Sequence, residues 1–153
     1  MSPTIHFRKL RWDDYAQCRG LCDETFHESE IPRFAAAWRN RNERASFVAT
    51  YYGTAIACAV VSHQNTIDYV AVHPDFQGYR IGSHMLRKIC AALKDARSII
   101  LKTADDITLP GWYARFGFEE SSVFMNDNYD FLGMLMIRRQ NCRSATRKFA
   151  NAK

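Results

Sequence analysis

The middle of the chain, residues 66–96, constrains the fold more than any other segment. It begins with TIDYVAVH, a run rich in β-branched and aromatic residues that predicts a strand ending before Pro74. The compact loop PDFQGYRIG follows, and the next stretch, SHMLRKICAALKDA, spaces its apolar side chains as an amphipathic helix does. A strand, a glycine-containing loop and a helix in this order indicate one crossover within a mixed sheet.

The elements on both sides of this segment define the fold class. Before it we expect a strand at 5–8, a helix at 12–22, a short helix after Pro32, and a hairpin of strands 46–51 and 55–62 around Gly53. After it we expect a strand at 98–102, a short helix at 110–115, and strands at 118–125 and 130–137. This order predicts an α/β or α+β fold, with a mixed, mostly antiparallel sheet of six to seven strands and about four helices.

The length and composition indicate one globular domain. The 153 residues are 47% hydrophobic, which is enough for a core that needs neither disulfides nor a metal to support it. No apolar run approaches the ~18 residues that cross a bilayer, and the start of the chain lacks the apolar centre of a signal peptide. We therefore expect a soluble, cytoplasmic protein with no membrane partner.

The charges divide the chain at Ile137. Residues 1–137 carry 15 Lys and Arg and all 16 acids, whereas residues 138–153 carry six cations and no acid. The excess of positive charge therefore belongs to a basic C-terminal tail, which is either a solvated end or a docking strip for an acidic partner. Nucleic acid would have to bind through this tail alone, and we do not expect it as a partner.

The cysteines and histidines do not form a metal-binding pattern. Cys18, Cys22, Cys58, Cys90 and Cys142 make no CxxC pair, and the five histidines are scattered. We expect reduced, mostly buried thiols and no metal site.

The loop after the strand is a candidate anion site. Backbone N–H groups at the start of a helix, with the positive end of the helix dipole, suit a pyrophosphate. Gly78 and Gly82 would let the backbone approach such a ligand, and Arg80 could add a charge. A plain strand-to-helix turn would contain the same glycines, so this alternative stays open. The loop is neither a Walker A sequence nor the GxGxxG of a dinucleotide fold.

Two stretches resemble the GNAT superfamily of N-acetyltransferases. YVAVHPDFQGYRIGSHML is similar to its acyl-CoA-binding motif, Q or R-x-x-G-x-G or A, and GWYARFGFEE is similar to its xxYxxxGF segment. Gln77 and Gly82 fit the first motif, whereas Arg80 stands where a glycine is expected, and we expect an ordinary φ there. By element order the resemblance covers residues 4–137. We therefore assign residues 1–137 to a GNAT N-acetyltransferase domain and 138–153 to the tail.

The resemblance implies acetyl-CoA as co-substrate, without a metal. The implied acetyl-CoA-binding residues are Val70, Ala71 and Val72 along the pantetheine arm, and Gln77, Gly78, Tyr79, Arg80, Ile81, Gly82 and Ser83 around the pyrophosphate. Tyr113 would protonate the departing thiolate, because a phenol with a pKa near ~10 can donate to a thiolate whose acid has a pKa near ~8.5. A role for Tyr113 in the core is the alternative.

The acceptor amine needs a base, because an alkylamine with a pKa near ~10.4 is almost wholly protonated at neutral pH. Asp68 shares a strand face with Val70 and Val72 and is the candidate, with an exposed or ion-paired carboxylate as the alternative. The local pattern looks most like the arylalkylamine and polyamine branch, although Thr66 and Asp68 stand where that branch has histidines. His63 and His73 are weaker candidates for a proton role.

The segment CDETFHESEIPRF would line the acceptor entrance in this fold, and we assign substrate binding to Phe26, Glu28 and Glu30. Asp23, Glu24 and Phe34 belong to the same segment, and its mixture of acids and rings suits a cation with an apolar stem. A small amine is therefore the first expectation. A peptide or protein acetyltransferase acting on lysine or an N-terminus is the alternative, as is a non-catalytic acyl-CoA-binding module. A homodimer is compatible with either.

Overall fold

The computed structural model describes residues 4–25, 33–104, 109–125 and 132–140. Two compact units make up the chain, Met1–Ile89 and Cys90–Lys153. We call them the first and the second unit.

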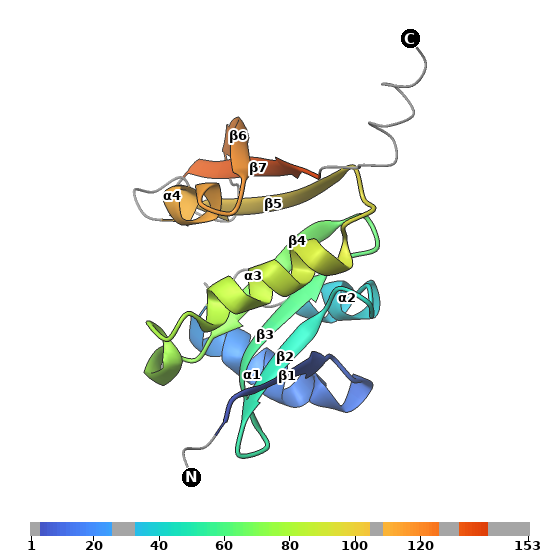
Figure 1. Ribbon diagram of the computed structural model, residues 1–153, viewed down its shortest axis with the longest axis vertical. Helices are drawn as coiled ribbons and strands as arrows, with labels where there is room; N and C mark the ends of the chain where they lie inside the picture. The colour runs from blue at the N-terminus through green and yellow to red at the C-terminus, as the bar shows by residue number, and fades with distance from the viewer. Residues whose placement is uncertain (1–3, 26–32, 105–108, 126–131, 141–153) are drawn as a thin grey trace. The chain divides into compact units, whose positions relative to one another are not determined.

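The first unit contains an antiparallel sheet of four strands in the order β1-β2-β3-β4 (Figure 1). Their bounds are β1 His6–Lys9, β2 Phe47–Tyr51, β3 Thr54–Val61 and β4 Thr66–Val72. The hairpin between β2 and β3 turns at Tyr52 and Gly53, whose φ angles are 51° and 76°. Two successive residues with positive φ are the mark of a tight hairpin turn whose twist matches that of the strands.

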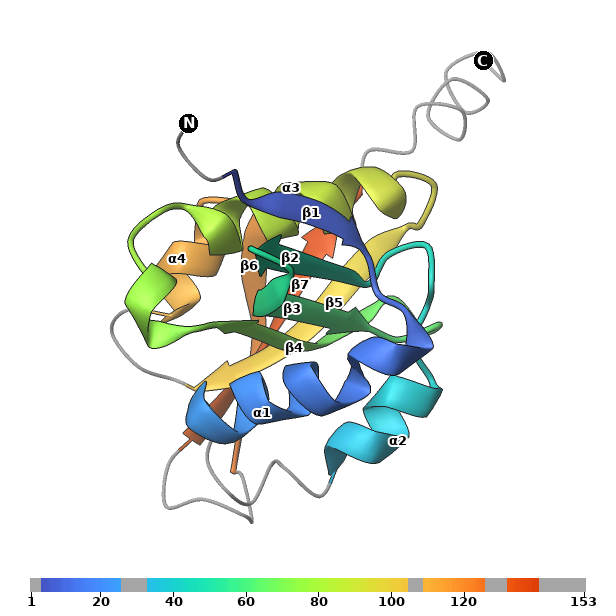
Figure 2. The ribbon, with the colours of Figure 1, turned by 90° about the horizontal axis from the view of Figure 1, so that it is seen from below.

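Helices cover both faces of this sheet. The helical segments are η1 Trp12–Asp14, α1 Tyr15–Thr25, α2 Phe34–Arg39, η3 Pro74–Phe76 and α3 Ile81–Ala92, the last of which ends in the second unit. Figure 2 shows α1 and α2 on one side of β3 and β4, with α3 on the other side. On the α3 side, the Phe7 ring lies 4.1 Å from that of His84, and the Lys88 ammonium lies 5.6 Å from the Phe47 ring.

One part of the core of the first unit lies between α1, α2 and the sheet, and another lies on the α3 side, where Ile81, Met85, Leu86 and Ile89 are buried. Phe34 and Trp38 of α2 are fully buried, and their rings lie 5.8 Å apart. The other buried members of this cluster are Leu10, Cys18, Leu21, Cys22, Val48, Ala55, Cys58, Val60, Tyr69 and Ala71. Because the odd-numbered residues of β4 enter this core, the even-numbered ones point to the α3 side.

The second unit contains a three-stranded antiparallel sheet in the order β5-β7-β6. Its elements are β5 Ser98–Ala104, α4 Leu109–Ala114, β6 Phe118–Met125 and β7 Leu132–Arg139. The side chain of Gln140, just after β7, donates to the carbonyls of Cys90 and Leu93 at 3.0 and 3.1 Å. These bonds tie the end of β7 to the segment that leaves α3.

The structure confirms the predicted fold class. Within the described residues there are seven strands and four α-helices, in the predicted order. Several bounds differ from the prediction by a few residues; α1, for example, spans Tyr15–Thr25 where 12–22 was expected, and β5 runs to Ala104 where 102 was expected. The helix after the loop begins at Ile81, and the last strand runs to Arg139, so the first two cations of the predicted tail belong to β7. The division of the chain into residues 1–137 and 138–153 stays a prediction.

Candidate functional site

The loop between β4 and α3 is held at its start by His73. The backbone N–H of His73 donates to the carbonyl of Ile56 at 2.8 Å, which keeps the end of β4 paired with β3. The imidazole Nδ1 accepts a hydrogen bond from the backbone N–H of Asp75 at 3.1 Å and so caps η3, where Pro74 is the first residue. His73 therefore has a local role in shaping the loop.

Gln77 connects the loop back to the strand. Its side-chain Nε2 donates to the carbonyl of Val72 at 3.1 Å, so the motif glutamine spans the turn that follows β4. The ring of Phe76 lies 5.2 Å from that of Tyr51 in β2 and packs the loop against the hairpin. The resemblance assigned Gln77 to ligand binding, and this contact adds a positioning role that its place in the sequence did not indicate.

The backbone enters α3 through two left-handed residues. Gly78 has a φ of 88° and Arg80 a φ of 64°. The expectation of an ordinary φ at Arg80 is therefore wrong, because the chain must reverse its direction within three residues to start α3. The left-handed region costs a residue with a Cβ roughly 1–2 kcal/mol, which explains why the family motif has glycine at this place.

This turn leaves a row of backbone donors without acceptors. The first backbone bond of the helix runs from His84 N–H to the Arg80 carbonyl at 3.1 Å. In the part of the chain that the structure describes, no group accepts from the N–H groups of residues 78–83. Residues 77–80 are largely exposed, Gly82 and Ser83 are half-buried, and the side chain of Ile81 is buried in the core. The donors and the helix dipole fit an anionic diphosphate.

The two faces of β4 divide the residues assigned to the pantetheine arm. Asp68 is exposed and Val70 and Val72 are half-buried on the α3 side, as the alternation predicts. Ala71 points to the other face, where it is 2% exposed and lies opposite Cys58. Ala71 can therefore offer a ligand only its backbone.

An acid from α1 lies at the same end of the sheet. Glu24 Oε2 is 3.5 Å from His73 Nε2, while the Nδ1 of that imidazole accepts from the loop. The pair connects the end of α1 to the loop. From the sequence we considered Glu24 and His73 separately and did not predict their contact. The two residues are 49 positions apart, and no periodic pattern in the sequence links them.

Tyr113 lies in α4 of the second unit among aromatic rings. Its ring centroid is 4.9 Å from that of Trp112 and 6.0 Å from that of Phe118. The side chain is half-buried, and burial raises the pKa of Tyr113 to about 12. The phenol is therefore protonated throughout the neutral and mildly alkaline range and is available as a proton donor.

The glycine of the xxYxxxGF segment has a structural reason. Gly117 has a φ of 87°, and a Cβ there would lie 3.7 Å from the Arg138 side chain. Arg138 Nη1 donates to the Phe116 carbonyl and the Cys90 Sγ, both at 2.9 Å. The strand β7 thus supports the turn that follows α4.

The predicted acceptor residues divide into two groups. Phe26, Glu28 and Glu30 lie outside the described residues, so their assignment stays a prediction. Asp23 and Glu24 are exposed at the end of α1. Phe34 was expected beside the acceptor, and this expectation is wrong. Its fully buried ring packs 5.2 Å from that of Tyr69 in the core.

In the part of the chain that the structure describes, no three His, Cys, Asp or Glu side chains gather as a metal site would require. No helix in the described ranges has the length and apolar character needed to cross a membrane.

Solved structures with the same fold support the assignment of these elements. The ribosomal-protein-S18-alanine N-acetyltransferase of Escherichia coli matches with a TM-score of 0.74 and 19% identity, over 89% of this chain and 94% of its own. Ard1 of Thermoplasma volcanium gives 0.75 and 16%, over 90% and 98%. Naa50 of Arabidopsis thaliana, solved with the bisubstrate analogue CoA-Ac-MVNAL, gives 0.70 and 15%, over 88% and 97%. At these identities the likeness is one of fold.

The sequence itself also matches a family. No curated protein is significantly similar to the chain. The family model of the acetyltransferase (GNAT) domain, however, matches residues 42–120, which is more than half of the chain and includes β2 to α4. The chain therefore belongs to the GNAT acetyltransferases and is an acyltransferase.

Proposed function

We propose that this acyltransferase moves the acetyl group of acetyl-CoA to the primary amine of a small cation, such as a polyamine or an arylalkylamine. The observation that carries the proposal is the row of unused N–H groups at residues 78–83, between β4 and α3. Because these donors lie at a helix start, they would bind the diphosphate of coenzyme A. Val70 and Val72 would lie along the pantetheine arm.

The reaction is a direct transfer in a ternary complex. The amine nitrogen attacks the thioester carbonyl carbon, the C–S bond breaks, and the thiolate takes a proton. Tyr113 supplies this proton, since a phenol with a pKa of about 12 stays protonated until the thiolate forms beside it. The ammonium group loses one proton to Asp68, or through water to solvent, before it attacks. The second proton leaves the nitrogen after the attack and restores the phenol of Tyr113, so that the products are the amide, the CoA thiol and one proton.

The small cationic acceptor is favoured by acids at the end of α1. Asp23 and Glu24 are exposed there, and Phe26, Glu28 and Glu30 follow in the sequence. A cluster of carboxylates attracts ammonium groups and raises their local concentration.

The four described cysteines are free and buried, which is compatible with a reducing cytoplasm as the place of action.

A second candidate acceptor is the N-terminus or a lysine of a peptide. It is favoured by the names of two structural neighbours, an alanine N-acetyltransferase and Naa50 bound to a peptide-containing bisubstrate analogue. Those names describe the neighbours' own substrates. Proteins that share a fold at such low sequence identity can act on different substrates, so the fold does not assign the neighbours' substrates to this chain.

The test is release of free CoA thiol from acetyl-CoA across a panel of amines. The panel contains spermidine, spermine, putrescine, tryptamine, tyramine, an amino sugar, and peptides with a free N-terminus or a lysine. We expect turnover with the polyamines or arylalkylamines, and loss of that turnover in Tyr113→Phe. Turnover with the peptides alone would replace the proposed acceptor. Absence of any acetyl-CoA binding would overturn the proposal as a whole.

A further inference from the structure

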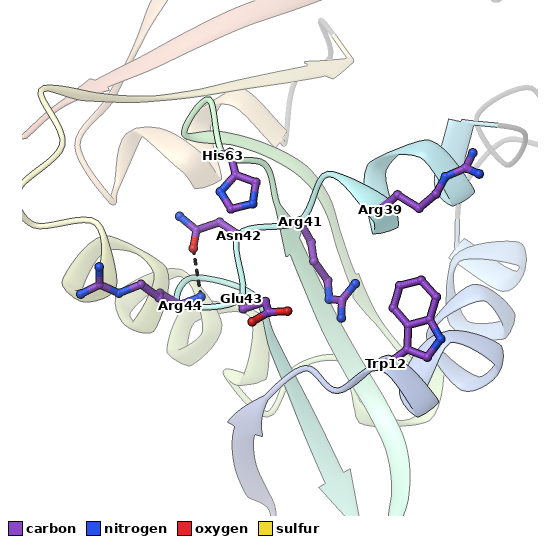
Figure 3. Close-up of a pocket in the computed structure, with 7 residues that line it drawn as sticks. All are labelled: Trp12, Arg39, Arg41, Asn42, Glu43, Arg44 and His63. Atoms are coloured by element: carbon purple, nitrogen blue, oxygen red, sulfur yellow. Dashed lines mark hydrogen bonds between the residues drawn. The ribbon is translucent and has the colours of Figure 1, made fainter.

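A pocket lined by arginines lies at the opposite end of the first unit's sheet from the acyl-CoA loop. Its volume is about 460 Å³, within the range of small-molecule sites, and Figure 3 shows the side chains that line it. They are Trp12, Arg39, Arg41, Asn42, Glu43, Arg44 and His63. These residues come from η1, the end of α2, the segment before β2 and the turn after β3. The seven-residue strand β4 separates this end from the loop by roughly 20 Å.

The centre of the pocket is a buried cation. Arg41 is 8% exposed, and its guanidinium lies 5.2 Å from the Trp12 ring and 4.8 Å from the Trp38 ring. Its Nη1 donates to the Trp38 carbonyl at 3.0 Å, while its buried Nε has no hydrogen-bond partner among the residues that the structure describes. A guanidinium has five N–H donors, and within the described part of the chain a protein acceptor engages one nitrogen of Arg41.

The side chains around Arg41 also provide little negative charge to balance its guanidinium. Among the described residues, no carboxylate lies within ion-pair distance of Arg39, Arg41 or Arg44. Glu43 is the one acid that lines the pocket, and it is exposed. Burying a cation without a counterion is costly, and the two indole rings offset only part of that cost. The pocket therefore carries an excess of positive charge that an anion binding from solution would neutralise.

We propose that this pocket binds a small molecule through its carboxylate or phosphate group. Guanidinium groups bind both oxyanions through paired N–H donors, which Arg41 can offer in the pocket. Arg39 and Arg44 are exposed at the rim, where their side chains extend to opposite sides in Figure 3 and add positive charge around the pocket. Trp12 is 65% exposed and offers an apolar ring face to the rest of the ligand. The backbone N–H of Arg44 donates to Asn42 Oδ1 at 2.9 Å, which holds the turn that carries both residues.

The test is a titration of the full chain with inorganic phosphate and, separately, with malonate. The readout is the indole N–H signal of Trp12 in nitrogen–proton correlation spectra, assigned with Trp12→Phe. We expect a saturable shift of this signal. Arg39→Gln and Arg44→Gln should each raise the dissociation constant several-fold, and Glu43→Gln should lower it by about two-fold, because the first two each remove a positive charge from the rim and the third removes a repulsion.

Arg87→Gln is the matched control, since it removes one exposed cation of α3 outside the pocket and should leave the dissociation constant unchanged. Preference for phosphate or for malonate identifies the oxyanion. The proposal is overturned if neither probe moves the Trp12 signal, if shifts are confined to the backbone of residues 78–83, or if Arg87→Gln weakens binding as much as Arg44→Gln does.

Discussion

The two ends of the first unit's sheet offer an anion different partners. After β4, the donors are backbone N–H groups of residues 78–83, exposed by left-handed turns at Gly78 and Arg80. Before β2, the donors are guanidinium side chains around Arg41. A backbone site depends on conformation and tolerates many side chains, whereas a side-chain site depends on residue identity and tolerates conformational change. Substitutions that change the backbone conformation should therefore weaken anion binding mainly at the loop end. Substitutions that remove a charged side chain should weaken it mainly at the pocket end.

The largest expected effect concerns turnover. Tyr113→Phe removes the proposed proton donor and should lower kcat about 100-fold, with little change in the Kd for acetyl-CoA. Arg44→Gln should leave kcat unchanged, because the pocket takes no part in the transfer.

Because burial raises the pKa of Tyr113 to about 12, the tyrosine should introduce no fall in kcat up to about pH 10. Initial rates measured across pH check both statements, and full activity of the Tyr113→Phe variant would remove the tyrosine from the mechanism.

The next largest effect concerns the pocket end. Asp14 accepts hydrogen bonds from Arg8 Nη1 and Nη2 at 2.7 and 2.8 Å and from the Arg11 N–H at 2.7 Å, and thereby holds the η1 turn that carries Trp12. Asp14→Asn should lower the free energy of unfolding by about 2 kcal/mol at neutral pH, because it replaces charged hydrogen bonds with weaker ones. Urea denaturation measures this difference.

The same contact gives a pH dependence with a definite sign. The hydrogen bond with Arg8 lowers the pKa of Asp14 below its ordinary value of 3.8. The contribution is therefore fully present above that value and is lost as the pH falls through the lower folded pKa. The stability difference between the wild type and Asp14→Asn should shrink below about pH 4. A difference that stays constant down to about pH 2 would show that the pair is not responsible.

A smaller effect is expected at the loop end. Gly78→Ala places a Cβ at a φ of 88° and should cost about 1 kcal/mol of stability, or roughly 2–4 °C in Tm, with weaker acetyl-CoA binding. Gly20→Ala is the matched control, because Gly20 lies in α1 at an ordinary φ with open space around it, and alanine should stabilise that helix. Equal Tm values for Gly78→Ala and the wild type would mean that the left-handed turn is not required.

The smallest effect is a gain in stability. Arg80→Gly relieves the left-handed arginine, but it also makes the unfolded chain more flexible, so the net gain should be about 0.5 kcal/mol. Arg80→Ala loses the same charge and keeps the strained φ, and it should show no gain. Thermal unfolding of the two variants distinguishes the effect of losing the charge from the effect of relieving the left-handed φ. Equal Tm values would contradict the strain at Arg80.

The same contrast explains how much could be predicted from the sequence. The loop end is local: a strand, two glycines and a helix lie within 66–96, so the spacing of residues indicated both the fold and the anion site. The pocket end unites Trp12, residues 39–44 and His63 through sheet pairing, and no local pattern indicates such a convergence. Phe34 was misassigned for a related reason, since an aromatic residue near an expected entrance and one in a core look alike in sequence.

The conformation of Arg80 shows a further limit of prediction from sequence. The motif comparison identified the position as unusual, yet residue preferences favoured an ordinary φ for arginine. The need of the chain to turn into α3 overrides this preference. Where a family motif has glycine and a chain has another residue, the backbone conformation is better inferred from the motif than from the residue.

The most direct test of the account is a calorimetric titration of acetyl-CoA into the full chain and two variants. We predict binding of one acetyl-CoA per chain, several-fold weaker binding to Gly78→Ala, and unchanged binding to Arg44→Gln. This result would place acetyl-CoA at the backbone donors after β4. Absence of binding to the wild type, or a loss of binding in Arg44→Gln with none in Gly78→Ala, would contradict the account.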